Sequence, residues 1–304
     1  MRSRARRPRV QSRLLRVFVL FALLGACADP ALLPPGSGPG TRARPLPVAA
    51  RAVGTWTVHD IPAPFEGSVL QFDGSYATLW RECGTLDYAA LVGPTGRLRV
   101  RLQGGGGTCD IDEGIPWLEA ATTLDADGER LVLEGPDGAR LATLERGGTP
   151  PVHESIAPEL ADDPILTDEI EATLTAPAIE VPAGLTPAAE DAVTGRWYPD
   201  RHSPADPDAA WLELRADGTW AGSDGCNGQG SVWLLEPSGW FRTGTWAQTA
   251  IGCGGIDVGR ALASSVALTF DVDGALVALD EDGTKTGRFV RDLSDSLADP
   301  SITV

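Results

Sequence analysis

Apolar and polar residues alternate with a period of two in two stretches of the chain. In residues 97–103 (RLRVRLQ), leucine and valine alternate with arginine and glutamine, and in residues 266–272 (VALTFDV) valine, leucine and phenylalanine take every second position. This alternation is typical of strands with one buried face and one face in water, which pair antiparallel. We therefore predict antiparallel sheets rather than a parallel α/β fold.

Asp-Gly pairs interrupt the predicted strands, as expected for tight hairpin turns. Short helices are predicted near residues 115–121 and 258–265, and a further one near 166–174. The predicted fold class is mainly β, with two small antiparallel β domains, barrel-like or curled sheets, each with a short helix. The Asp-Gly pairs lie at 73–74, 127–128, 137–138, 217–218, 273–274 and 282–283.

Residues 54–146 and 195–291 form two copies of one unit. Both begin with a glycine two residues before a tryptophan, continue through an Asp-Gly turn and two solitary cysteines, and close with an apolar segment around another Asp-Gly. The offset between matched landmarks drifts only from 141 to 145 residues. A drift this small indicates an internal duplication. Residues 147–194, rich in proline and acids, are predicted to be an extended linker, and residues 292–304 a C-terminal tail.

The chain begins with an export signal. Seven arginines precede or flank an apolar run at 17–26, which is shorter than the roughly twenty residues that span a bilayer. A positive start, a short apolar run and small residues at its end are typical of a signal peptide, here residues 1–26. A twin-arginine signal is an alternative, although Pro8-Arg9 after the arginine pair fits that pattern poorly.

The end of this signal, Leu24-Gly25-Ala26-Cys27, resembles the lipobox of bacterial lipoproteins. The resemblance implies that Cys27 carries diacylglycerol and becomes the first residue; an ordinary signal peptide with an incidental cysteine is the alternative. Residues 27–53, rich in proline, glycine and alanine, are then a flexible tether. Localisation is predicted to be the cell envelope, on a membrane through the lipid anchor.

Charge excludes two classes of partner. Loss of seven arginines with the signal lowers the net charge from −17 to about −24. A chain this acidic is repelled by nucleic acid and by anionic lipid headgroups. We expect a monomer whose only membrane contact is the lipid anchor.

The remaining four cysteines are predicted to form disulfides. Their separations of 26 and 27 residues and the duplication select Cys83–Cys109 and Cys226–Cys253. A zinc site needs closely spaced ligand pairs, and a catalytic thiol needs a nearby base; neither pattern is present. The Asp-rich turns lack the twelve-residue spread of acids of a calcium loop. No metal or other cofactor is expected.

The second unit resembles META domains, the HslJ-like family of bacterial envelope lipoproteins. The segment GSDGCN matches the family's G-x-x-G-C-N signature, and TAIGC matches T-x-M-x-C with isoleucine in place of methionine. The first unit has Arg-Glu-Cys-Gly at the first motif and is a divergent copy. The residues that carry the resemblance are Gly222, Gly225, Cys226, Asn227, Thr249 and Cys253.

The resemblance implies an envelope protein linked to heat response, antibiotic tolerance or virulence, without an established reaction. We predict a non-enzymatic binding or stress-protective module, in which Asn227 takes a turn or left-handed backbone and bonds the local main chain. Trp211 is predicted on the wetter face of its strand, either as rim packing or as a recognition surface. The alternatives are an interaction or inhibitor protein using Trp211, and a cell-wall hydrolase with a pair of carboxylates in a cleft.

Overall fold

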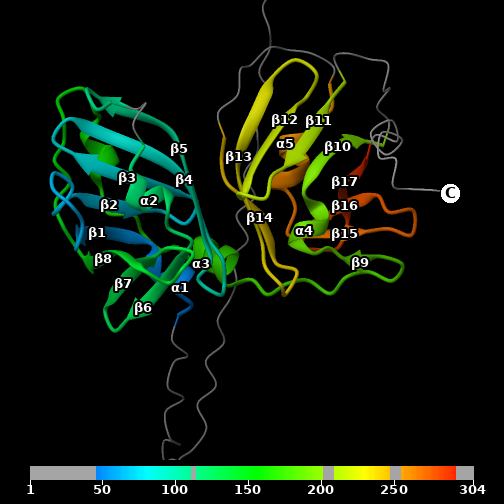
Figure 1. Ribbon diagram of the computed structural model, residues 1–304, viewed down its shortest axis with the longest axis horizontal. Coiled ribbons are helices and arrows are strands. Elements are labelled where there is room, and N and C mark those ends of the chain that lie inside the picture. The colour runs from blue at the N-terminus through cyan, green and yellow to red at the C-terminus, as the bar shows by residue number, and fades with distance from the viewer. Residues whose placement is uncertain (1–45, 111–113, 201–208, 247–254, 292–304) are drawn as a thin grey trace, which may run out of the picture. The chain divides into compact units, whose positions relative to one another are not determined.

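Two antiparallel sheets with the same strand order make up most of the structure (Figure 1). The computed structural model describes residues 46–110, 114–200, 209–246 and 255–291, all within one compact unit that begins at Pro45. The predicted signal peptide, Cys27, Thr249, Cys253 and the C-terminal tail lie outside the described residues. The mainly β fold class is confirmed, and both sheets are curled.

The first sheet has the order β5-β4-β3-β2-β1-β8-β7-β6. It follows helix α1 (Val48–Ala52), and helix α2 (Pro116–Glu119) lies between its fifth and sixth strands. The strands are β1 (Gly54–His59), β2 (Val69–Phe72), β3 (Tyr76–Arg81), β4 (Gly84–Val92), β5 (Leu98–Gly107), β6 (Thr123–Asp127), β7 (Arg130–Glu134) and β8 (Arg140–Arg146).

The second sheet has the order β14-β13-β12-β11-β10-β17-β16-β15-β9, which repeats that of the first sheet with one added edge strand, β9 (Thr186–Pro187). Helix α4 (Glu190–Val193) lies between β9 and β10, and helix α5 (Val258–Ala263) takes the place of α2. The strands are β10 (Gly195–Pro199), β11 (Trp211–Leu214), β12 (Thr219–Ser223), β13 (Gly228–Leu235), β14 (Phe241–Thr243), β15 (Ala267–Phe270), β16 (Leu276–Leu279) and β17 (Lys285–Val290).

Both units close in the same way around their first tryptophan. The indole of Trp56 donates from Nε1 to a carbonyl of α1, and that of Trp197 donates to a carbonyl of α4, each at 2.7 Å. The guanidinium of Arg146 lies 4.7 Å from the Trp56 ring centre, and that of Arg291 lies 4.2 Å from Trp197. Each buried indole thus links the preceding helix, the first strand and the end of the last strand.

The predicted Asp-Gly turns are present. The glycine of all six pairs has a positive φ, between 63° and 109°, a backbone region that only glycine enters without steric cost. The aspartate stabilises the turn as well: the Asp73 carboxylate accepts from the N–H groups of Ser75 and Tyr76 at 2.9 and 2.8 Å. The predicted helices at 115–121, 166–174 and 258–265 correspond to α2, α3 (Asp168–Thr175) and α5.

The predicted tether extends too far toward the first unit. Its last residues form α1, in which Ala49, Ala50 and Ala52 are buried against the first core. Alanine repeats carry little hydrophobic periodicity, so no pattern in the sequence indicated this helix. The first unit therefore begins before residue 54.

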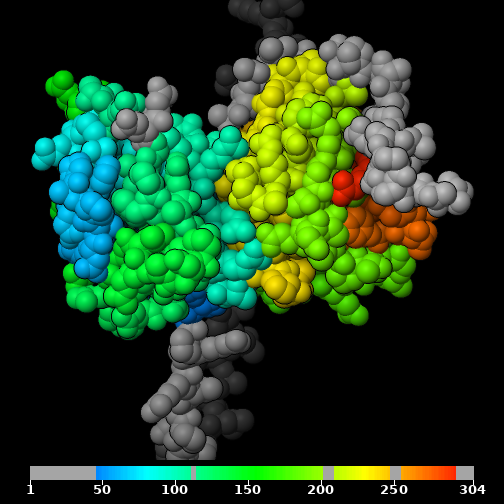
Figure 2. Space-filling view, viewed as in Figure 1, coloured from blue at the N-terminus to red at the C-terminus, as the bar shows by residue number. Residues whose placement is uncertain are grey.

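The linker, predicted to be extended, packs against the second sheet. There it buries the face of β15 that the sequence pattern predicts to be in water. Alternation predicted a wet face at Ala267 and Thr269, but both are buried. Ile179 and Leu185 of the linker pack on the side of β15 that carries Ala267. Strand β9, also in the linker, pairs with β15. Figure 2 shows this part of the linker in light green against the orange surface of the sheet. Val272, predicted to be buried, is 89% exposed.

Equivalent strands of the two sheets, β4 and β13, pack together. Ala89 and Leu91 from β4 form one buried cluster with Val232 and Leu234 from β13. Each alanine–valine and leucine–leucine pair occupies matching positions in the two units, as the strand registers show. The two copies thus contact one another through the same face, as in an isologous dimer.

Polar groups surround this apolar contact. Thr95 donates to the Glu236 carboxylate at 2.7 Å, and Arg97 donates to the carbonyl of Leu235 at 2.8 Å. Arg97 and Arg99 both form ion pairs with Glu190, at 2.6 and 3.2 Å. These bonds join the β4–β5 region to the start and the middle of the second unit.

Candidate functional site

The loop that carries the GCN motif is organised by Asp224. Its carboxylate accepts from the backbone N–H groups of Cys226 and Asn227 at 2.8 and 2.6 Å, and from the Asn227 side-chain amide at 2.9 Å. The bond from the Asn227 amide is the largest cause of a lowered Asp224 pKa. Asn227 lies in the turn, as predicted, but the left-handed backbone belongs to Gly225, with φ of 100°.

Gly222 of the motif and Gln229, two residues after it, fasten this loop to β11 and α5. A side-chain atom added to Gly222 would lie 2.9 Å from both the Trp211 carbonyl and Val258, so β12 needs glycine here. Gln229 accepts from the N–H of Gly259 at 2.8 Å and donates to Asp257 at 3.0 Å. The motif residues therefore serve packing of the loop, strand and helix.

The Cys83–Cys109 disulfide is confirmed, with Cα atoms 4.9 Å apart. Cys226 is disulfide-bonded as well; its predicted partner Cys253 lies outside the described residues, as do Thr249 and Cys27. A disulfide indicates an oxidising compartment.

Trp211 lies on the less buried face of β11 beside Glu213, as predicted. The Arg196 guanidinium stacks 4.3 Å from its ring centre. Glu213 in turn pairs with Arg196 at 3.9 Å and Arg215 at 3.0 Å. The Trp211 ring therefore already stacks on a cation of the same chain, Arg196. A recognition role for Trp211 stays a prediction.

One face of the first sheet is covered by a segment that no sequence pattern placed there. Part of the linker, which we call the strap (residues 149–164), contacts the side of this sheet opposite its core. The Thr55 hydroxyl donates to Asp163 at 2.6 Å, and the Gln71 amide donates to the carbonyls of Ala161 and Asp162 at 3.2 and 3.0 Å. The strap buries little of itself, since Leu160 is 64% exposed.

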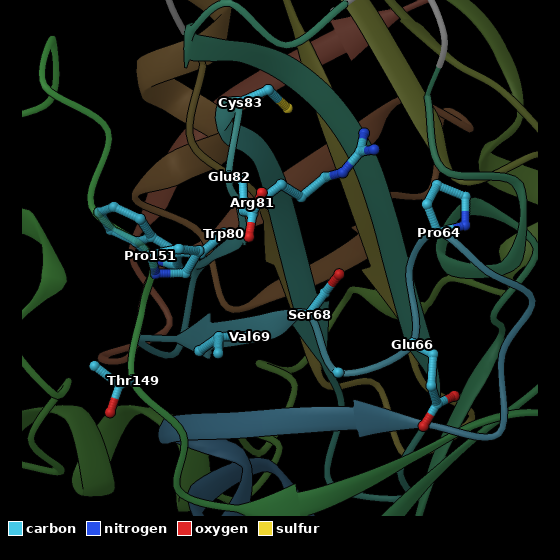
Figure 3. A pocket seen from close by; sticks show the side chains of 11 residues that line it. Pro64, Glu66, Ser68, Val69, Trp80, Arg81, Glu82, Cys83, Thr149 and Pro151 are labelled. Atoms are coloured by element: carbon cyan, nitrogen blue, oxygen red, sulfur yellow. The ribbon is translucent and has the colours of Figure 1, made fainter.

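An open cleft of about 530 Å³ lies at one end of the strap (Figure 3). Trp80, Arg81 and Glu66 line it with Thr149 and Pro151 of the strap, among other residues. Two of its charged groups, Arg81 and Glu66, have partners within the protein.

The Arg81 guanidinium lies 4.6 Å from the Phe65 ring centre. Glu66 contacts His59 at 2.9 Å, and this hydrogen bond is the largest cause of a lowered Glu66 pKa. His59 also lies 3.5 Å from Glu145. In this cleft, therefore, Arg81 and Glu66 are already engaged within the protein, which makes it a weaker candidate for a binding site.

A second cavity, of about 330 Å³, lies under the other end of the strap, and we call it the strap cavity. Strands β2, β3 and β4 form its floor, and strap residues form its cover. Its lining is Gln71, Asp73, Tyr76, Thr78, Trp80, Thr85, Asp87, Leu160, Asp162 and Pro164.

Asp87 is the distinctive group of the strap cavity. Its carboxylate accepts from the hydroxyls of Thr78 and Thr85 at 3.1 and 3.5 Å. Burial raises the Asp87 pKa, and the two hydroxyl bonds offset part of this effect. No lysine, arginine or histidine lines the cavity within the described part of the chain. The carboxylate thus lies in a partly desolvated place with neutral donors alone.

Trp80 and Tyr76 give the cavity aromatic surface. The Trp80 indole is 1% exposed and is fixed by a 2.6 Å bond from Nε1 to Gln71. Burial raises the Tyr76 pKa, and the charges of Asp87 and Asp73 raise it further. Asp87 and Asp73 therefore both lie close enough to act on the tyrosine.

The second sheet lacks this chemistry. In the first sheet Thr78 faces Asp87 across β3 and β4, whereas the register of β12 and β13 places Ala221 opposite Gly230. The position of Trp80 is taken by Ser223. The candidate site therefore belongs to the first unit, which lacks the GCN motif. The available sequence signal was the single acid, Asp87, inside the largely apolar run of β4.

Comparisons with known proteins give no relative: no family model, curated protein or solved structure matches the chain. Within the described ranges, no group of three or more His, Cys, Asp or Glu side chains is placed to hold a metal ion. None of the helices in those ranges has the length and apolar character needed to span a bilayer.

Proposed function

We propose that the protein is a non-enzymatic binding protein of the bacterial envelope, held on a membrane through lipidated Cys27, which captures a small ligand in the strap cavity. The observation that carries the binding role is this 330 Å³ cavity, in which a carboxylate without a basic partner, hydroxyls and aromatic rings lie beneath residues of the strap. Small-ligand sites combine concave apolar walls with a few polar groups in this way.

Three features support the wider setting. The disulfide fits an exported protein, the lipobox-like segment fits an anchor, and the GCN motif fits a META-like envelope module. Rigid, disulfide-closed sheets are a suitable scaffold for a binding site, because they hold its residues in place without ligand. A stress-protective role would follow if the captured molecule is harmful or scarce under stress.

Filling the strap cavity is expected to abolish binding. We expect a panel of sugars, amines and amino acids to contain compounds that raise the Tm of the wild-type protein by 2 °C or more, roughly the effect of a ligand at ten times its Kd. Thr78→Phe places a ring in the cavity and should remove that shift. Ala221→Phe, the matched change on the second sheet, should retain it.

Two outcomes would count against this proposal. One is a panel in which no compound shifts the Tm. The other is a shift that survives Thr78→Phe, because the ligand would then bind elsewhere.

Replacing Cys27 with serine is expected to release the protein from the membrane. Each buried CH₂ of an acyl chain contributes about 0.8 kcal/mol to membrane binding, so loss of the lipid removes the anchor. Wild type should sediment with membranes and show the added mass of the lipid, whereas Cys27→Ser should be found in the supernatant. A wild-type protein of unmodified mass would exclude the anchor.

A further inference from the structure

The charges around the strap cavity have one sign. Asp73, Asp87 and Asp162 line it, and no basic side chain of the described residues does. Asp73 is engaged in its turn through hydrogen bonds from Ser75 and Tyr76. Asp87 has only the two threonine hydroxyls. A negatively charged ligand would be repelled here.

A half-buried carboxylate without a cation is costly to the folded protein. Burial disfavours its charged form, which is why its pKa is raised. The folded pKa lies above the unfolded one, so the folded state holds the proton more tightly, and stability falls as pH rises through that interval. At neutral pH Asp87 therefore costs stability unless a positive charge enters the cavity. Residues that reduce stability in this way are common at functional sites.

The aromatic groups favour one kind of cation. The Tyr76 ring provides aromatic surface beside Asp87, and the face of such a ring attracts alkylammonium groups as well as their methylenes. A metal ion would need several oxygen ligands, and the described residues hold no such cluster. An organic cation needs one carboxylate, a nearby aromatic surface and room for a few carbon atoms.

We propose that the ligand of the strap cavity is a small organic cation, an amine or quaternary ammonium compound whose nitrogen pairs with the Asp87 carboxylate. This rests on the proposed binding function and adds the ligand class. Thr78 and Thr85 hold the carboxylate in place, and the strap closes over the bound molecule.

The test uses choline and putrescine as cationic probes, with glucose and glutamate as neutral and acidic comparators, measured by titration calorimetry on the full mature protein. Wild type should bind at least one cation and neither comparator. Asp87→Asn, which keeps the side-chain shape, should weaken cation binding by at least about tenfold, because the charge pair is lost. Asp125→Asn removes the same charge from an exposed position of β6 and should leave binding unchanged.

The thermal stability of Asp87→Asn without ligand is a second, independent measurement. Without ligand at pH 7, Asp87→Asn should raise the Tm by about 1–2 °C, since the uncompensated charge is gone. If Asp87→Asn fails to fold, Asp162→Asn at the cover of the cavity should still reduce the affinity for the cations.

The other outcomes separate the two proposals. Binding of glucose or glutamate that Thr78→Phe abolishes, without binding of either cation, would overturn the organic-cation inference and leave the binding function standing. Cation binding that is unchanged in both aspartate variants would also overturn the inference. No binding by any compound of the wider panel would overturn both.

Discussion

Replacing Cys83 and Cys109 together with serine is expected to lower the free energy of unfolding by about 3–4 kcal/mol, the loop-entropy value for a closed segment of this length. The disulfide joins residues 26 positions apart. In the folded state these ends already meet, since β4 and β5 pair beside them and Thr108 donates to the Cys83 carbonyl at 2.7 Å. The bond therefore acts mainly on the unfolded chain, which gains freedom when it is removed.

Urea unfolding of the double variant measures this loss. Both proteins carry Cys27→Ser, so that they are compared without the lipid and with the other cysteines unchanged. A loss below 1 kcal/mol would mean that the unfolded chain is already restricted in this region. A variant that does not fold would be tested instead by mild reduction of the wild type, with free thiols mapped to Cys83 and Cys109.

Replacing Leu234 with aspartate is expected to cost about 3–5 kcal/mol, as for other unpaired charges placed in a core. Leu234 is fully buried where β13 packs on β4. The nearby Glu236 carboxylate is 2% exposed, so the new charge would meet a like charge as well as a dry environment. The contact between the two sheets should weaken.

The unfolding curve shows whether this contact couples the sheets. Wild type should unfold in one transition followed by tryptophan fluorescence and circular dichroism together, whereas Leu234→Asp should separate the two probes. Val272→Asp, at a position 89% exposed, is the control and should stay within about 0.5 kcal/mol of wild type. A Leu234→Asp protein as stable as this control would show that the β4–β13 contact contributes little.

Local patterns predicted two of the strands, three short helices and six turns, because such features arise from residues close together in the chain. An Asp-Gly pair specifies a turn through the positive φ of glycine and the aspartate side chain, and all six predicted turns are present. Cysteine spacing and the duplication selected Cys83–Cys109 correctly. The assignment failed where a distant segment covers a face: Thr269 is buried under the linker although its own strand predicts exposure.

In the candidate site, too, local sequence patterns indicated some features, and contacts with distant segments decided others. The GCN motif attracted attention as a sequence signature, yet Asp224 and Asn227 bond each other to shape a loop. Asp87 carries no signature, because nothing in its neighbours along the chain shows that Thr78 and the strap will surround it. A lone acid among many acids gains meaning only from what lies near it in space.

The amino-acid sequence by itself determined the two alternating strands, the Asp-Gly turns, the duplicated pattern and one sulfur pairing, since each depends on residues close in the chain or on matching copies. Tertiary structure alone decided that equivalent strands of the two copies pack together, that the linker lies along the first sheet, and that a cavity with an unpaired carboxylate remains beneath it. These features depend on contacts between residues about 70 to 140 positions apart, such as Gln71 with Asp162 and Thr95 with Glu236, which no local pattern encodes.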